Sequence, residues 1–280
     1  MGLRLNAAGL TNMGQVRGNN EDSIFYLVPG EASIPMGLFI VADGVGGHLA
    51  GELASGWAVS AARDALRDLF APQGKSQTHP LDPKRAPPVG SADDTLNAKR
   101  MYSMSERILR AAQSANRAVY ANAQQQPDEA GNASTTLTMA LVRGERVFVA
   151  NVGDSRTYLL RGDEIRQITT DHSLIAGLVR SGNVKPEELY THPARNVIVR
   201  SLGTAPEVDV DLFEEQLQAG DTLLLCSDGL WEMVRGSDRI GEIVRRAETP
   251  MQACRDLIEA ANQAGGQDNI SVIVVWVESM

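Results

Sequence analysis

Cysteine and histidine are scarce in this sequence, and neither residue type is clustered. The two cysteines, Cys226 and Cys254, lie in separate apolar or helical stretches, which indicates neither a disulfide framework nor a structural zinc site. The four histidines lie far apart and form no His-Glu-x-x-His pattern. These absences argue against disulfide-stapled folds and against zinc-dependent hydrolases.

The sequence also lacks an excess of positive charge and any long apolar run. Its net charge of −9 argues against a surface for nucleic acid or anionic membranes, because both require a basic face. No apolar run approaches the roughly 20 residues that span a bilayer, and the N-terminus has no signal-peptide core. We therefore expect a cytoplasmic protein without a nucleic-acid or membrane partner.

Apolar residues make up 43% of the 280 residues, which is enough for a substantial core. Short β-rich runs dominate, and the helical stretches that interrupt them come in pairs. Because few β-α-β alternations occur, the pattern predicts an α+β layered sandwich built on antiparallel sheets. The predicted strands are 4–10, 23–28, 37–42, 135–142, 146–152, 157–160, 164–168, 208–216, 222–226 and 270–277. The predicted helices are 49–70, 97–125, 237–246 and 250–264.

A long segment between the first two predicted helices, residues 71–94, is rich in Pro, Gly, Ser and Asp. This composition is typical of a surface loop. We interpret the segment as a mobile surface insertion and not as a domain boundary. Residues 1–280 are therefore expected to form a single domain.

Four aspartates stand where an apolar strand ends or begins, each close to a glycine: Asp43, Asp154, Asp228 and Asp268. One such aspartate is usually a turn former, because its side chain bonds nearby backbone. Strand ends that converge in a layered fold bring such carboxylates together, and like charges this close need a cation to stay ionised. Hard oxygen ligands select Mg²⁺ or Mn²⁺ over zinc. Together the four aspartates predict a site for divalent cations.

A fifth acidic group, Glu21 and Asp22, follows Arg17 within a few residues. Taken alone, this segment reads as a solvated turn with a surface arginine. Beside a metal site, Arg17 becomes a candidate for binding a phosphate through its planar guanidinium.

These motifs, in this order, resemble those of the bacterial type-2C metal-dependent Ser/Thr phosphatases. The resemblance covers nearly the whole chain, and no single motif carries it. The matching segments are 17–22, 43–48, 152–156, 170–173, 192–203, 226–230 and 266–270.

The resemblance implies a four-layer α/β/β/α sandwich, in which two antiparallel β-sheets are flanked by helix pairs and a metal cleft lies at one end. It implies that Asp43 bridges two cations, Mn²⁺ or Mg²⁺, and that the Gly44 carbonyl completes one coordination shell. The other implied ligands are Asp228 and Asp268 for the second cation, Glu21 and Asp22 through water, and Asp154 with Asp228 for a third, weaker cation.

The implied reaction is hydrolysis of phosphoserine or phosphothreonine in proteins. A water that bridges the two cations attacks phosphorus directly, without a phosphoenzyme, while Arg17 binds the phosphate. The implied partners are phosphorylated proteins, including a Ser/Thr kinase, and the protein is expected to be a monomer. A pseudophosphatase is the alternative, but such proteins usually lose a metal aspartate and none is missing here.

Two features bear on how the family pattern applies to this chain. Relatives from eukaryotes carry a histidine two residues after the bridging aspartate, whereas this chain has Val45, so the general acid is not identified. Residues 174–195 correspond to the family's flap beside the cleft. Within it, Arg180, Lys185 or Arg195 could contact a phosphopeptide, and the alternative is ordinary surface charge on a mobile loop.

Overall fold

Two antiparallel β-sheets form the centre of the molecule in the computed structural model, which describes residues 2–30, 34–47, 49–71 and 103–280. Sheet 1 has the strand order β1 (Leu3–Asn12), β11 (Ile270–Ser279), β10 (Thr222–Cys226), β7 (Arg156–Arg161), β8 (Glu164–Gln167). Sheet 2 has the order β2 (Asp22–Leu27), β3 (Met36–Val45), β5 (Leu137–Arg143), β6 (Arg146–Val152), β9 (Asp211–Gln216), and β4 (Ser134–Thr135) pairs with the end of β3.

Each sheet buries both of its faces, which explains why the central strands read as continuous apolar runs. In β3, Phe39 and Val41 face sheet 1, whereas Leu38 and Ile40 face the helices outside sheet 2. This alternation follows from the two-residue period of a strand. The space between the sheets is filled from sheet 1 by side chains such as Ile273.

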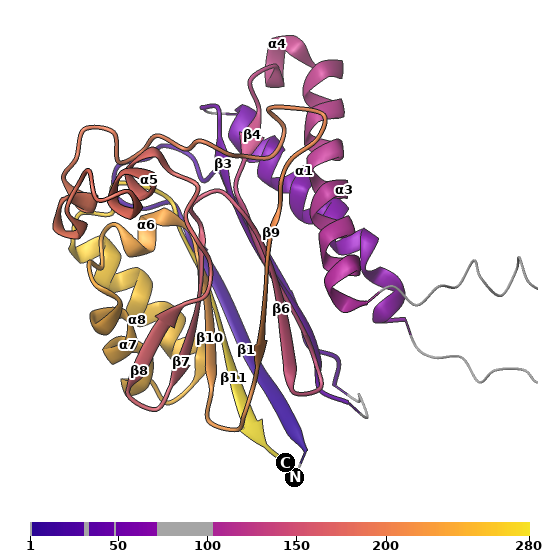
Figure 1. The fold of residues 1–280 in the computed structure, drawn as a ribbon, viewed down its shortest axis with the longest axis vertical. Coiled ribbons are helices and arrows are strands. Elements are labelled where there is room, and N and C mark those ends of the chain that lie inside the picture. The colour runs from indigo at the N-terminus through magenta and orange to yellow at the C-terminus, as the bar shows by residue number, and fades with distance from the viewer. Residues whose placement is uncertain (1, 31–33, 48, 72–102) are drawn as a thin grey trace, which may run out of the picture.

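Helix pairs form the two outer layers (Figure 1). Helices α1 (Leu49–Ala65) and α3 (Met104–Gln125) cover sheet 2, and α7 (Ser237–Arg246) and α8 (Pro250–Gln263) cover sheet 1. A capping box starts α3, where Glu106 N donates to Ser103 Oγ (3.2 Å) and Ser103 N donates to Glu106 Oε2 (2.8 Å). The predicted four-layer sandwich is confirmed.

Most of the predicted elements occur, with shifts at their ends. The predicted strand 135–142 is divided, because Thr136 leaves the ladder and its N–H donates to Asp43 O (2.9 Å). The predicted strand 208–216 begins only at Asp211, where pairing with β6 ends at Asn151, and the carbonyl of Asp209 accepts from Arg200 (3.4 Å). Short helical segments were not predicted: η1 (Arg67–Leu69), α4 (Pro127–Ala130), α5 (Leu174–Arg180), η2 (Pro186–Tyr190) and α6 (Asp228–Trp231).

The predicted insertion at 71–94 lies outside the described residues except for its first residue, so its nature stays a prediction. The same holds for the start of the helix predicted from residue 97. At the opposite end of sheet 1 from α6, the two chain ends meet: Met280 N donates to Gly2 O (2.8 Å), and N and C lie together in Figure 1. None of the helices that the structure describes is both long and apolar enough to span a bilayer.

Candidate metal centre

The predicted site residues near the N-terminus meet where β2 begins and β3 ends. Asp22 and Asp43 are register partners in the β2–β3 pair, so their side chains leave neighbouring positions on the sheet. Gly44 N donates to Glu21 O (3.2 Å), which extends the contact by one residue. The sheet register therefore places four of the predicted residues side by side, although Asp43 lies about twenty residues further along the chain.

Two threonines hold the backbone of Asp43. Thr136 Oγ1 accepts from Asp43 N (3.0 Å), and Thr135 Oγ1 donates to Asp43 O (2.7 Å). Both threonines are fully buried. Their place at the start of a predicted strand did not indicate this role. They fix the part of β3 that presents the Asp43 carboxylate.

Gly44 occupies a position where no other residue fits. A Cβ added there would overlap the carbonyl oxygens of Gly51 and Glu21. The backbone of α1 thus approaches the end of β3 closely, with only hydrogen atoms between them. Glycine at this position keeps the backbone of Gly44 within reach of the cleft.

The remaining predicted carboxylates come from loops at the same end of the two sheets. Asp228 is the first residue of α6, two residues after β10 ends, and Asp268 precedes β11. Asp154 follows β6, and its carbonyl accepts from Trp231 Nε1 of α6 (3.0 Å). Ser227 Oγ donates to Asp22 Oδ2 (2.8 Å), which ties the end of sheet 1 to the start of β2 in sheet 2.

Mutual repulsion and burial act on these carboxyl groups together. Burial, followed by neighbouring negative charges, raises the pKa of Asp43 well above its ordinary value. Those charges belong, in order of effect, to Asp228, Asp22, Asp154 and Asp268. The pKa of Asp228 is likewise raised well above normal by burial and then by Asp154 and Asp268. Carboxylates that perturb one another this strongly form one electrostatic site.

The two most buried members of this cluster show the same effect. Burial and then the charge of Asp171 raise the pKa of Asp154 to about 7. Burial raises the pKa of Asp22 to about 6, although hydrogen bonds from Ser271 and Ser227 act in the opposite direction. Both groups are therefore costly to ionise unless positive charge is brought close.

Unpartnered oxygen atoms in this cluster fit a cation. Among the described residues, one buried carboxylate oxygen each of Asp22, Asp154 and Asp228 has no hydrogen-bond partner. A buried anionic oxygen without a donor is rare, and a divalent cation would satisfy it. The donor set consists of hard oxygen atoms, which suits Mg²⁺ or Mn²⁺.

The carboxylate side chains of the cluster nevertheless do not converge on one position. In the described part of the chain, no group of three His, Cys, Asp or Glu residues is arranged to hold a metal ion by itself. One reason is that Asp268 Oδ2 accepts from Arg17 Nη2 (2.7 Å), so this carboxylate faces the arginine. The carboxyl groups raise one another's pKa values, which indicates that they lie in one region. Their rotamers do not point at a common position. Arg17, predicted to bind phosphate, therefore lies at the cleft, with half of its side chain exposed.

Asn269 is an organising residue that the sequence analysis did not assign. Its Oδ1 accepts from Glu21 N (2.8 Å), and its Nδ2 donates to Met13 O and Asn19 O (both 2.9 Å). The side chain is buried and holds the whole segment that carries Arg17 and Glu21 against Asp268. Its place directly after a predicted ligand was the only available signal.

A buried ion pair beside the cluster was also missed. Arg156 donates to both oxygens of Asp171 (2.6–3.1 Å), and its guanidinium lies 3.5 Å from the ring centroid of Trp231. Gln167 Nε2 donates to Asp171 Oδ1 as well (2.7 Å). Since Trp231 also binds the Asp154 carbonyl, this cluster supports the loop that carries Asp154.

The predicted flap at 174–195 contains α5 and η2, and two of its arginines contact residues outside it. Arg180 Nη1 donates to the carbonyl of Asp171 (3.2 Å), and Arg195 Nε lies 3.8 Å from Glu232 Oε2. Both arginines therefore have partners within the protein. Lys185 precedes η2 on the exposed surface.

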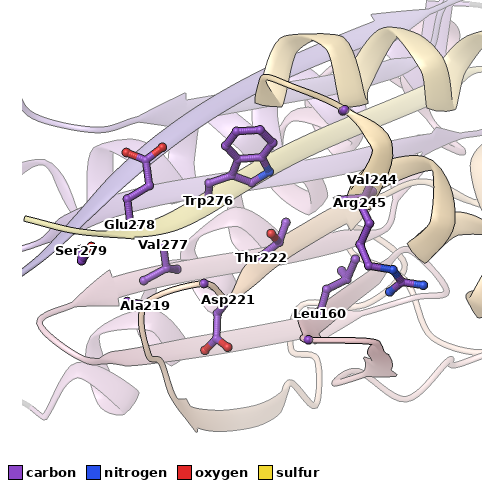
Figure 2. Close-up of a pocket in the computed structure, with 13 residues that line it drawn as sticks. Leu160, Ala219, Asp221, Thr222, Val244, Arg245, Trp276, Val277, Glu278 and Ser279 are labelled. Atoms are coloured by element: carbon purple, nitrogen blue, oxygen red, sulfur yellow. The ribbon is translucent and has the colours of Figure 1, made fainter.

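A cavity of about 650 Å³ lies at the opposite end of sheet 1 and shares no residue with the carboxylate cluster. Figure 2 shows it between the ends of β10 and β11, marked by Thr222 and Trp276, and the end of α7 at Arg245. Two carboxylates line it: Asp221 accepts from Arg161 through two hydrogen bonds of 2.8 and 2.7 Å, and Glu278 accepts from Arg4 Nε (3.0 Å). Its chemistry gives no reason to place a metal centre there.

Comparison with known proteins agrees with the geometry. The model of the family described as protein phosphatase 2C matches residues 15–264. The chain belongs to the protein phosphatase 2C family. It is 36% identical over 267 residues to the serine/threonine phosphatase stp of Listeria innocua, covering 95% of this chain and 93% of that protein.

Solved structures of the protein phosphatase 2C type share the fold. Stp1 from Staphylococcus aureus superimposes with a TM-score of 0.76 at 32% identity, covering 98% of this chain and 96% of that one. The catalytic domain of the serine/threonine protein phosphatase PstP, solved in complex with two manganese ions, has a TM-score of 0.76 at 33% identity. That match covers 99% of this chain and all of the other. The resemblance predicted from the motifs is confirmed.

Proposed function

We infer that this protein is a metal-dependent protein Ser/Thr phosphatase of the 2C type, which hydrolyses phosphoserine and phosphothreonine in other proteins. One observation of this molecule supports the inference most. Carboxylates from five strand ends lie in one repelling cluster, and three of them have a buried oxygen without a partner among the described residues. Membership of the family supplies the reaction class.

We propose that the cluster holds Mn²⁺ or Mg²⁺, as the two manganese ions bound to PstP suggest. The residues proposed to bind the two main cations are Asp43, the Gly44 carbonyl, Asp228, Asp268 and, through water, Glu21 and Asp22. Asp154 is proposed for a third cation. When bound, the cations lower the pKa of water at the cleft and offset negative charge on the phosphate.

The chain's own groups then have separable tasks. Thr135 and Thr136 fix the backbone of Asp43, while Asn269 holds the segment with Arg17 beside Asp268. We propose that Arg17 binds the phosphate oxygens, because its guanidinium is half exposed at the cleft and carries further N–H donors. Val45 has no proton to donate, so water in the cleft would protonate the leaving alkoxide.

The remaining expectations concern the protein's setting and are proposals. Its substrates are phosphorylated proteins, and we propose a Ser/Thr kinase among them. We propose further that residues 1–280 act as one cytoplasmic, monomeric phosphatase domain, and that residues 174–195 border the bound substrate.

The test is hydrolysis of a phosphothreonine peptide with and without Mn²⁺. The purified protein should release phosphate with Mn²⁺ and stop when excess chelator is added. Asp43→Ala should abolish turnover while the far-ultraviolet circular dichroism stays unchanged. Asp163→Asn, in the exposed turn between β7 and β8, is the matched control and should retain full activity. Undiminished turnover in chelator would rule out a metal-dependent mechanism.

A further inference from the structure

A groove of about 580 Å³ lies between the end of β1 and the exposed side of α8. Ligand sites in proteins commonly measure roughly 300–1,000 Å³, so the groove is large enough for several residues of a bound chain. Its walls are formed mainly by Leu10, Asn12, Gln15, Arg255, Ile258 and Asn262. No function described above uses it.

The groove is continuous with the candidate metal centre through two shared segments. Gln15, which lines the groove, donates its N–H to Gly266 O (2.7 Å). Two residues further along each segment, Arg17 donates to Asp268 (2.7 Å). The segments that border the cleft therefore continue directly into the groove wall.

The lining suits an extended polypeptide. Ile258 is buried and Leu10 half-buried, which gives an apolar floor. Side-chain amides surround it and can pair with the backbone N–H and C=O groups of a bound chain. The walls are held together in advance, because Asn12 Oδ1 accepts from Gly14 N (2.9 Å) and from Asn262 Nδ2 (3.2 Å).

One cation in the groove is available to an acidic ligand. Arg255 is exposed and forms no ion pair within the residues that the structure describes. Glu259, one turn further along α8, also lines the groove and accepts from Gln263 Nε2 (2.9 Å). The planar guanidinium of Arg255 can therefore pair with a carboxylate side chain of a bound chain.

We propose that this groove binds the part of the substrate that flanks the phosphorylated residue, and that Arg255 selects an aspartate or glutamate there. The proposal rests on the phosphatase function and adds a sequence preference to it. Arg255 lies eight residues before Gln263, the last residue of α8, which is about 12 Å along the helix at about 1.5 Å per residue. The segment that carries Asp268 follows Gln263, so a bound chain has to cover about 12 Å or more between Arg255 and the candidate metal centre. An extended chain covers about 3.3 Å per residue, so the acidic residue lies about four or more positions from the phosphorylated one.

The experiment compares phosphothreonine peptides that differ only at positions four to seven on either side, with glutamate in one set and glutamine in the other. For the unmodified protein with Mn²⁺, kcat/KM should be about two- to fivefold higher with glutamate, the range expected of an exposed ion pair. Arg255→Ala should remove this preference and Arg255→Glu should reverse it. Arg246→Ala on α7 is the control and should leave the preference unchanged.

Hydrolysis of p-nitrophenyl phosphate, which has no flanking chain, separates the two hypotheses. All four proteins should hydrolyse it at the same rate. If they do, and Arg255→Glu still shows the unmodified peptide preference, the groove assignment is wrong and the phosphatase function stands. If the unmodified protein hydrolyses neither substrate, the phosphatase function itself is overturned.

Discussion

Two buried aspartates on neighbouring loops, Asp154 and Asp171, are treated by the fold in opposite ways. Asp171 receives hydrogen bonds from Arg156 and Gln167 on both of its oxygens. Asp154 keeps a buried oxygen without a partner among the described residues, and its pKa is raised to about 7. Asp171 is therefore fully paired within the protein, whereas Asp154 is not. Since an unpaired buried carboxylate reduces stability, the difference supports the proposal that Asp154 and its cluster bind a cation.

Removal of one carboxylate from the repelling cluster should have the largest effect and tests the difference between the two aspartates most directly. Asp228→Asn should lower phosphopeptide turnover by at least about 10³-fold, because an essential electrostatic group is lost. Without divalent cations the free energy of unfolding should not fall, since the substitution relieves repulsion from Asp154 and Asp268. Urea denaturation in chelator, alongside the activity assay, measures both. A variant that is active or strongly destabilised would contradict the assignment.

The opposite result is expected for the compensated aspartate. Asp171→Ala should lower the free energy of unfolding by about 3–5 kcal/mol, because Arg156 is left buried without its partner. Urea denaturation provides the measurement. A double variant, Arg156→Met with Asp171→Leu, should recover much of the loss, since neither buried charge then remains. A single variant as stable as the unmodified protein would show that the pair is not buried as described.

Asn269 is a neutral residue whose side chain is fully hydrogen-bonded, and it lies beside the charged cluster. Its substitution tests whether such a residue affects activity as well as stability. Asn269→Ala leaves Glu21 N and the carbonyls of Met13 and Asn19 without partners, which should cost about 1–3 kcal/mol of stability. The KM for a phosphopeptide should rise more than kcat falls, because the segment with Arg17 loosens. Steady-state kinetics with Mn²⁺ held constant gives the two values. If other variants with a similar loss of stability show the same changes in KM and kcat, the role of Asn269 is purely structural.

The last prediction concerns the pH dependence of stability. Asp22 and Asp154 have pKa values of about 6 and about 7 in the folded protein, against an ordinary value of 3.8. The folded state therefore holds protons that the unfolded state has released. In chelator, stability should accordingly fall as pH rises from about 4 through about 7. Asp154→Asn should show a shallower fall, and Mn²⁺ should remove it. Denaturation curves across this pH range provide the check.

The sequence predicted the layers well because its signals were strong. The buried strands are apolar on both faces, and the turns between β5 and β6 and between β7 and β8 each contain a glycine at positive φ, Gly144 and Gly162. The carboxylates could be predicted because each stands at a strand end, where the fold topology decides that they meet. Strand 222–226 and helix 237–246 were placed to the residue.

The supporting contacts could not be predicted because they join residues that no local pattern relates. Asn269 reaches Met13 and Asn19 across almost the whole chain length, and Thr135 reaches Asp43. Short helices such as α6 were missed because four residues carry no periodicity. The hydrogen bond from Arg17 to Asp268 was likewise invisible, since a sequence shows which residues approach a cleft but not which one binds another.

The meeting of Gly2 and Met280 has a consequence for protein engineering. Because both chain ends lie at the far end of sheet 1 from α6, a fluorescent protein or affinity tag fused at either end would stay clear of the cleft (Figure 1). The same proximity permits a circular permutant, in which a short linker joins the present ends and new ends open in the exposed turn at Gly162.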